Sequence, residues 1–220
     1  MAPRNNVRLL VLSLTLALVF FAGFPSLDVA AAPASEGVAL PDLATFAISV
    51  LDGNSDTLKG VYVEDVMALP VIQQPYAAYV SEAPGTITQF GMASSYGVTG
   101  LLAHNFLSGA LFFHLEPGQS VNLVYGDGDI DTYWVTDILR YQATSPNSIY
   151  SGFVNLRTGK GTDAEGMFRK VYMGKDQVTF QTCIAKDGIG SWGRLFVIAS
   201  SDPEKAEQAR LEARQLAVLE

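Results

Sequence analysis

The sequence predicts a mainly β domain made of short strands joined by tight turns. Of its 220 residues, 49% are apolar, which is enough for one globular domain with a continuous core. Its 20 glycines and 10 prolines lie among runs rich in Val, Thr, Tyr and Phe, the residue types that pleated strands favour. Residues 126–129 (Gly-Asp-Gly-Asp) separate two such runs and are a strong hairpin signal.

Residues 1–31 have the layout of a signal peptide or signal-anchor. Arg4 and Arg8 precede an uncharged apolar run at 9–24, and small residues follow at 29–32. The run is shorter than the roughly 20 residues that span a bilayer comfortably, although tilt or local thinning could accommodate it. We expect an exported protein, either secreted or at the extracellular face of the cell membrane. Membrane contact is expected only through this segment if it is uncleaved, and a buried core helix fits its basic flank poorly.

The remaining chain divides into three parts. Residues 32–59 are a linker and a first element, in which the apolar run 45–51 fits a strand or a short helix. Residues 60–200 form the β domain, and residues 201–220 form a charged C-terminal helix that begins at a capping sequence containing Asp202 and Pro203. The expected strands lie at residues 61–63, 67–72, 86–92, 100–104, 121–125, 132–141, 177–184 and 195–199. Residues 145–172 fit a mixed loop with one short helix at 164–172.

Cys183 is the single cysteine of the chain. It cannot belong to an internal disulfide, so it is an inert buried thiol, an intermolecular disulfide partner or a nucleophile. Oxidising compartments damage idle exposed thiols, which favours the functional interpretation in an exported protein. Alternation along its strand places Cys183 on the face opposite the apolar side chains of Val178 and Phe180.

Arg194 and His104 are the candidate partners of this thiol. Arg194 opens the strand that follows Cys183, and its permanent charge could favour a thiolate and stabilise an oxyanion, or could merely end a strand. An ordinary thiol is mostly protonated near neutral pH, so it needs a base such as histidine. His104 ends an apolar strand, whereas His114 follows a short helical stretch and is expected at the surface. We therefore choose His104.

Several motifs of this chain resemble those of the sortase family, in the family's order of His, Cys and Arg. Residues 179–183 (Thr-Phe-Gln-Thr-Cys) resemble the signature Thr-Leu-x-Thr-Cys, with Phe180 replacing Leu. Further likenesses are the histidine strand at 100–105, the turn at 115–121, the Tyr-x-Val pattern at 133–135, and Arg194 followed by the apolar run 195–199. Ala103 stands where many members have Gly, and the helix after residue 201 is an addition to the family pattern.

The resemblance implies a sortase-like antiparallel β-barrel over residues 60–200 and a cysteine transpeptidase activity. In that family the cysteine cleaves a Leu-Pro-x-Thr-Gly-like (LPxTG-like) sorting signal through a thioester acyl-enzyme. An amine, from a cell-wall precursor or a pilin lysine, then accepts the acyl group. By this resemblance Cys183 is the nucleophile, His104 the proton donor and acceptor, and Arg194 the group that steadies substrate and oxyanion. The preferred signal, the acceptor, and anchoring versus pilus polymerisation stay open, as does the oligomeric state.

Two rival functions are open. One is a catalytically idle exported β-barrel used for binding or as a structural module, with Cys183 serving only in packing. The other is a different cell-wall cysteine enzyme such as an L,D-transpeptidase, but the Ser-His-Gly-Cys arrangement of those enzymes is missing before Cys183.

No cofactor is expected. Asp127, Asp129 and Asp131 alternate like the start of a calcium loop, but the Gly and the bidentate Glu of an EF-hand are missing, so calcium is possible but unsupported. One Cys and two separated His residues give no zinc spacing. The formal net charge of −8 argues against non-specific nucleic-acid binding, which needs a cationic surface.

Overall fold

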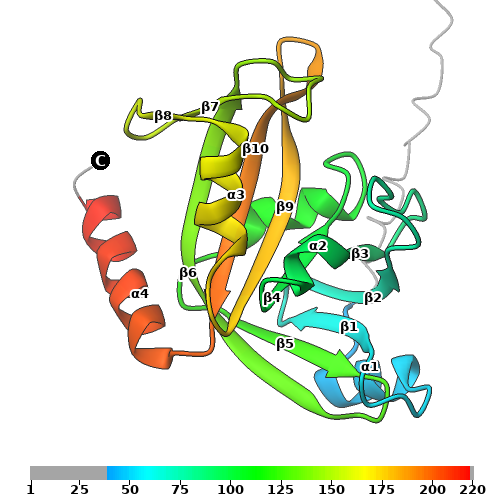
Figure 1. Ribbon diagram of the computed structural model, residues 1–220. Coiled ribbons are helices and arrows are strands. Elements are labelled where there is room, and N and C mark those ends of the chain that lie inside the picture. Colours follow the sequence, from blue (N-terminus) through cyan, green and yellow to red (C-terminus); the bar gives the residue numbers. More distant parts are fainter. Residues whose placement is uncertain (1–38, 219–220) are drawn as a thin grey trace, which may run out of the picture. The chain divides into compact units, whose positions relative to one another are not determined.

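The computed structural model describes residues 39–218 and consists of a closed β-barrel with short helices packed on it (Figure 1). The helices are α1 (Leu43–Val50), α2 (Gly91–Ser94), the 3-10 helix η1 (Ser108–His114), α3 (Ala164–Tyr172) and α4 (Pro203–Val218). The strands are β1 (Leu58–Val63), β2 (Met67–Gln73), β3 (Ile87–Phe90), β4 (Val98–Leu102), β5 (Ser120–Tyr125), β6 (Ile130–Ala143), β7 (Phe153–Asn155), β8 (Gly161–Thr162), β9 (Gln177–Lys186) and β10 (Ile189–Ser200). The predicted signal segment, residues 1–31, lies outside the described residues. No helix between residues 39 and 218 combines the length and hydropathy needed to cross a bilayer.

Eight strands close the barrel in the order β10-β9-β4-β3-β2-β1-β5-β6, and β6 pairs back with β10. The short strands β7 and β8 extend the sheet beyond β6. The predicted mainly β barrel with short helices and a C-terminal helix is confirmed. It is not antiparallel throughout, because β2 pairs with β3 and β4 pairs with β9 in parallel. Long connections join each parallel pair, and a motif-based prediction does not reveal which strands such connections bring together.

Several predicted boundaries shift in the structure. Residues 45–51, for which the sequence allowed a strand or a short helix, belong mostly to helix α1. Asp42 caps the start of this helix, because its side chain accepts a hydrogen bond from the Thr45 amide at 2.8 Å. The strand predicted at 86–92 stops at Phe90 and turns into α2. The strands predicted at 177–184 and 195–199 extend to Lys186 and back to Ile189, and a tight hairpin joins them, in which Asp187 and Gly188 both have positive φ, as a type I′ turn requires.

Buried side chains form three clusters, one inside the barrel, one under α3 and a smaller one between α1 and the strands β1 and β5. The interior is filled by one cluster that includes Phe180 and Phe112, whose rings meet edge to face at 5.2 Å between centroids. A second cluster lies where α3 covers the outer face of β6, β9 and β10 (Figure 1). Phe180, which stands where the sortase signature has Leu, is fully buried and packs in the barrel interior.

Ionisation of Tyr125 lowers the stability of the fold at high pH. Its burial, followed by the negative charge of Asp131, raises the pKa of Tyr125 to about 12. Because the folded state holds this proton more tightly than the unfolded state, stability is fully present below about pH 10 and falls as pH rises toward 12. We expect chemical denaturation of Tyr125→Phe to show a shallower loss of stability over that range. An identical alkaline slope in the variant and the wild-type protein would contradict this assignment.

Candidate active site

The parallel pairing of β4 with β9 brings the predicted site residues to one end of the barrel. Leu102, the last residue of β4, is in register with Gln181 of β9. The Ala103 amide continues the pairing by donating to the Gln181 carbonyl at 3.3 Å, and the Thr182 hydroxyl donates to the Ala103 carbonyl at 2.8 Å. Because parallel strands run in the same direction, this register carried forward places His104 beside Cys183.

Arg194 lies on the other side of Cys183. The two residues are direct cross-strand partners in the antiparallel pair β9–β10. Directly opposite residues of an antiparallel pair have their side chains on the same face, with Cβ atoms about 4.5–5.5 Å apart. Extending the β4–β9 register two residues past the end of β4 therefore gives the row His104, Cys183, Arg194, although the sequence separates its first and last members widely.

Cys183 lies on the outer face of the barrel and is half-buried. Val178 and Phe180 on the same strand are fully buried in the interior, which confirms the predicted alternation. The outer face is covered further down by α3, where the Tyr172 hydroxyl donates to the Gln181 side chain at 2.6 Å. Cys183 is thus excluded from the barrel interior and lies beyond the part of the strand that α3 seals.

The Arg194 guanidinium is held by backbone carbonyl groups and not by a carboxylate. Nη1 donates to the carbonyls of Ser191 and Gly193, both at 2.8 Å, and Nη2 donates to that of Pro146 at 3.4 Å. None of the ion pairs formed within residues 39–218 includes Arg194. A guanidinium has five N–H donors, so its charge and some of its donors stay available to an anionic group.

His104 is positioned by its own loop. Its carbonyl accepts from the amides of Leu107 and Gly109, each at 3.0 Å, and its ring stacks on Phe106 at 5.1 Å between centroids with an interplanar angle of 18°. Between Cys183 and His104, both within the described region, the structure has no hydrogen bond. Hydrogen bonds between catalytic groups often tighten only when substrate binds. The other histidine, His114, is exposed at the end of η1, as predicted.

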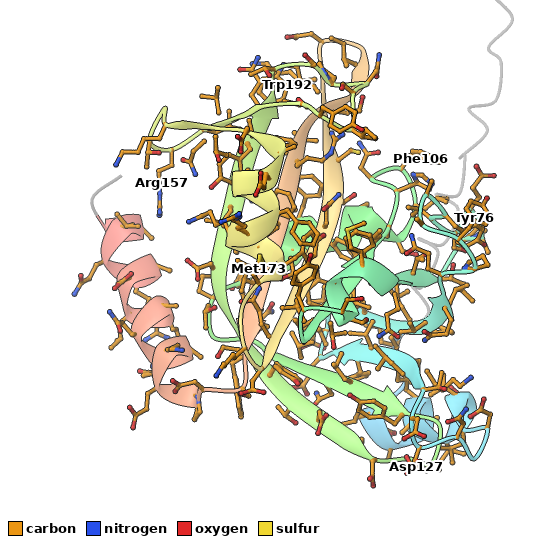
Figure 2. The ribbon with its side chains drawn as sticks, in the orientation of Figure 1. Tyr76, Phe106, Asp127, Arg157, Met173 and Trp192 are labelled. Carbon is orange, nitrogen blue, oxygen red and sulfur yellow. The ribbon has the colours of Figure 1, made fainter. Side chains whose placement is uncertain are left out.

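Sequence reasoning missed Asn105 and Phe106. The Asn105 side-chain amide donates to the Gly190 carbonyl at 3.2 Å, which ties the His104 loop to the β9–β10 hairpin. Phe106 is 75% exposed although it stacks on an imidazole. Figure 2 labels Phe106 on its loop beside β9 and Trp192 on the hairpin above. Asn105 follows the histidine directly, but its partner is 85 positions away, so the sequence carried no signal for this contact.

The turn that carries His104 leaves no room for a side chain at Gly109. A Cβ there would lie 2.7 Å from the carbonyl oxygens of Ala103 and His104 and would overlap the Thr182 hydroxyl. We expect Gly109→Ala to destabilise the fold by about 1–3 kcal/mol, because a well-packed backbone has to move. Gly190→Ala is the matched control, since a Cβ at that position meets nothing within 4 Å. Urea denaturation of both variants checks this, and equal stabilities would show that the turn is loosely packed.

Of the aspartates considered for calcium, Asp127 and Asp129 belong to the turn between β5 and β6, whereas Asp131 lies in β6. The Asp129 amide donates to the Asp127 carboxylate at 3.1 Å, a contact typical of a polar turn. Within residues 39–218, no group of three or more His, Cys, Asp or Glu side chains is placed to hold a metal ion.

Solved structures similar to this chain include sortases of several classes. Sortase A from Listeria monocytogenes is 14% identical, with 68% of this chain and 87% of that chain covered and a TM-score of 0.42. Sortase E1 from Streptomyces coelicolor, solved with a tripeptide in its active site, is 17% identical over 68% of this chain and 89% of that chain, with a TM-score of 0.42. Sortase C-1 from Actinomyces oris is 15% identical over 73% and 80% of the two chains, with a TM-score of 0.43.

The mainly β barrel expected from the sequence is shown by the strand pairings of this structure itself. No family model matches the sequence, and no curated protein matches it either. The roles of Cys183, His104 and Arg194 rest on their own geometry and on the motifs.

Proposed function

We propose that this protein is an exported sortase-like cysteine transpeptidase with Cys183, His104 and Arg194 as its catalytic residues. The observation that supports this most directly is the direct pairing of Cys183 with Arg194, together with the β4–β9 register, which places His104 beside Cys183 when it is extended past the end of β4. A half-buried thiol beside an imidazole and a guanidinium without a carboxylate partner is the constellation that thiol-based acyl transfer needs.

The reaction proceeds in two acyl transfers. In the first, the Cys183 sulfur attacks a peptide carbonyl carbon while its proton passes to His104. The tetrahedral oxyanion is stabilised by the Arg194 cation. As the C–N bond breaks, His104 returns the proton to the leaving amine, and the acyl group stays on sulfur as a thioester. In the second, an acceptor amine attacks the thioester carbonyl, loses a proton to His104 and releases the thiol.

The proposed donor is an LPxTG-like sorting signal, cleaved between Thr and Gly, and the proposed acceptor is an amine at the cell surface, of a cell-wall precursor or a pilin lysine. These identities follow from the motif resemblance at residues 179–183 and around His104. The location, at the extracellular face of the membrane or secreted, rests on the signal layout of residues 1–31.

Peptide transfer distinguishes this function from its rivals. The full chain is incubated with LPxTG-like peptides and with a cell-wall stem peptide, each with hydroxylamine as acceptor, and products are separated by chromatography. The proposal requires a hydroxamate of the sorting peptide that Cys183→Ala does not form. A hydroxamate from the stem peptide alone would identify an L,D-transpeptidase-like enzyme. If all peptides of a broad library stay unchanged, the protein is better explained as a catalytically idle binding module. The observation that favours this alternative is the absence of a hydrogen bond between Cys183 and His104.

A further inference from the structure

Charge is strongly segregated along the chain. Residues 39–139 carry eleven acidic side chains against a single lysine, whereas residues 140–218 carry eleven Lys and Arg against eight acids. Residues 140–218, which run from the end of β6 through α4, thus hold eleven of the 14 Lys and Arg residues of a protein whose net charge is −8.

Three of these cations surround one hollow. Lys170 of α3, Lys175 of the following turn and Lys205 of α4 line a space of about 360 Å³ over the outer face of β6 and β10. Figure 2 labels Met173, which lies between the first two lysines in the chain, at the end of α3. This volume lies at the lower end of the roughly 300–1,000 Å³ range of ligand pockets. The hollow is far from the catalytic row, because Ser200 at its edge is six residues along β10 from Arg194, about 20 Å.

The lysines have little competition for an anion. Among the ion pairs of the described residues, Lys170 and Lys175 have none, and Lys205 is 3.7 Å from Asp202 in an exposed pair. Asp137 is the single carboxylate that lines the hollow, and the structure forms no ion pair between it and a described lysine. Hydroxyl groups of Thr136 and Ser200 line the same space. Phosphate oxygens accept hydrogen bonds from ammonium and hydroxyl groups, and in this hollow such groups come from separate helices, strands and turns.

We propose that this lysine hollow, defined by Lys170, Lys175, Lys205, Thr136 and Ser200, binds a phosphate-bearing anion of about the size of a diphosphate. The occupant is either a soluble phosphate group or the phosphate of an anionic lipid headgroup. The inference does not depend on the chemistry proposed for Cys183, because it uses none of the catalytic residues.

Isothermal titration calorimetry of the full chain with inorganic pyrophosphate, at low ionic strength, tests the site directly. We expect saturable binding that weakens about three- to five-fold for each single lysine→Gln change, as exposed charges typically contribute. The triple variant K170Q/K175Q/K205Q should bind at least about ten-fold more weakly. The Asp137→Asn variant should bind more tightly, because it removes the one repelling carboxylate.

The matched control is K160Q/R169Q/R214Q, which removes the same charge from residues outside the hollow. If this control weakens binding as much as the hollow triple variant does, the attraction is diffuse and the site is refuted. Binding of the full chain to phosphatidylcholine vesicles with and without phosphatidylglycerol separates the two sources. Lysine-dependent binding to pyrophosphate identifies a soluble phosphate ligand, and lysine-dependent binding to the anionic vesicles alone identifies a headgroup. The absence of both contradicts the proposal.

Discussion

Replacing Arg194 by Ala should lower the rate of peptide transfer about 10²- to 10³-fold, equivalent to about 2.7–4 kcal/mol of transition-state stabilisation. The guanidinium lies opposite Cys183 and is oriented by three carbonyl groups, so its charge is preorganised beside the position that the proposed mechanism gives to the oxyanion. Arg194→Lys should recover only part of the activity, since an ammonium keeps the charge but not the planar fork of donors. Initial rates of hydroxamate formation measure both effects.

The control for Arg194 is Arg214→Ala, which removes the same charge from an exposed position of α4. It should leave the transfer rate unchanged. Thermal unfolding of each variant separates lost chemistry from lost structure. A folded Arg194→Ala variant that transfers peptide at the wild-type rate would remove Arg194 from the mechanism.

Replacing His104 by Ala should lower the transfer rate about 10²- to 10⁴-fold, the range that general acid–base catalysis contributes. Without the imidazole, the thiol has no adjacent base and the leaving amine has no proton donor. The two histidines of the chain form a natural pair of experiments, because His114 is exposed at the end of η1.

His114→Ala should behave as the wild-type protein does in the same assay. If His104→Ala retains full activity, or if His114→Ala is the inactive variant, the assignment of the base is wrong. A pH profile adds a second test, since loss of the base should also remove the profile's dependence on imidazole ionisation.

The sequence alone predicted the parts of the fold that depend on local patterns. Alternation placed Phe180 in the interior and Cys183 on the outer face, and a capping sequence predicted the C-terminal helix at 201–220, which the structure begins at Pro203. The helix expected at residues 164–172 is α3, with the same bounds. These features succeed because each depends on neighbours a few residues apart.

Features that depend on distant residues escaped the sequence. The parallel pairing of β4 with β9 joins segments that are separated in the sequence by four strands and two helices, and no local pattern encodes it. The hydrogen bonds from the Asn105 side chain to the Gly190 carbonyl and from the Arg194 side chain to the Pro146 carbonyl likewise join residues far apart in the sequence. Motif order gave the three site residues, whereas only the sheet register shows how they come to lie side by side.

The measurement that tests the central claim most directly is intact-protein mass spectrometry of the full chain mixed with LPxTG-like peptides. The proposed mechanism predicts a mass increase equal to the acyl fragment, located on Cys183 by proteolysis, absent from Cys183→Ala and discharged by hydroxylamine. If Cys183 stays unmodified across a broad peptide library, while a thiol-reactive probe labels it readily, the thiol is accessible but not a nucleophile for acyl transfer. That result would contradict the transpeptidase assignment.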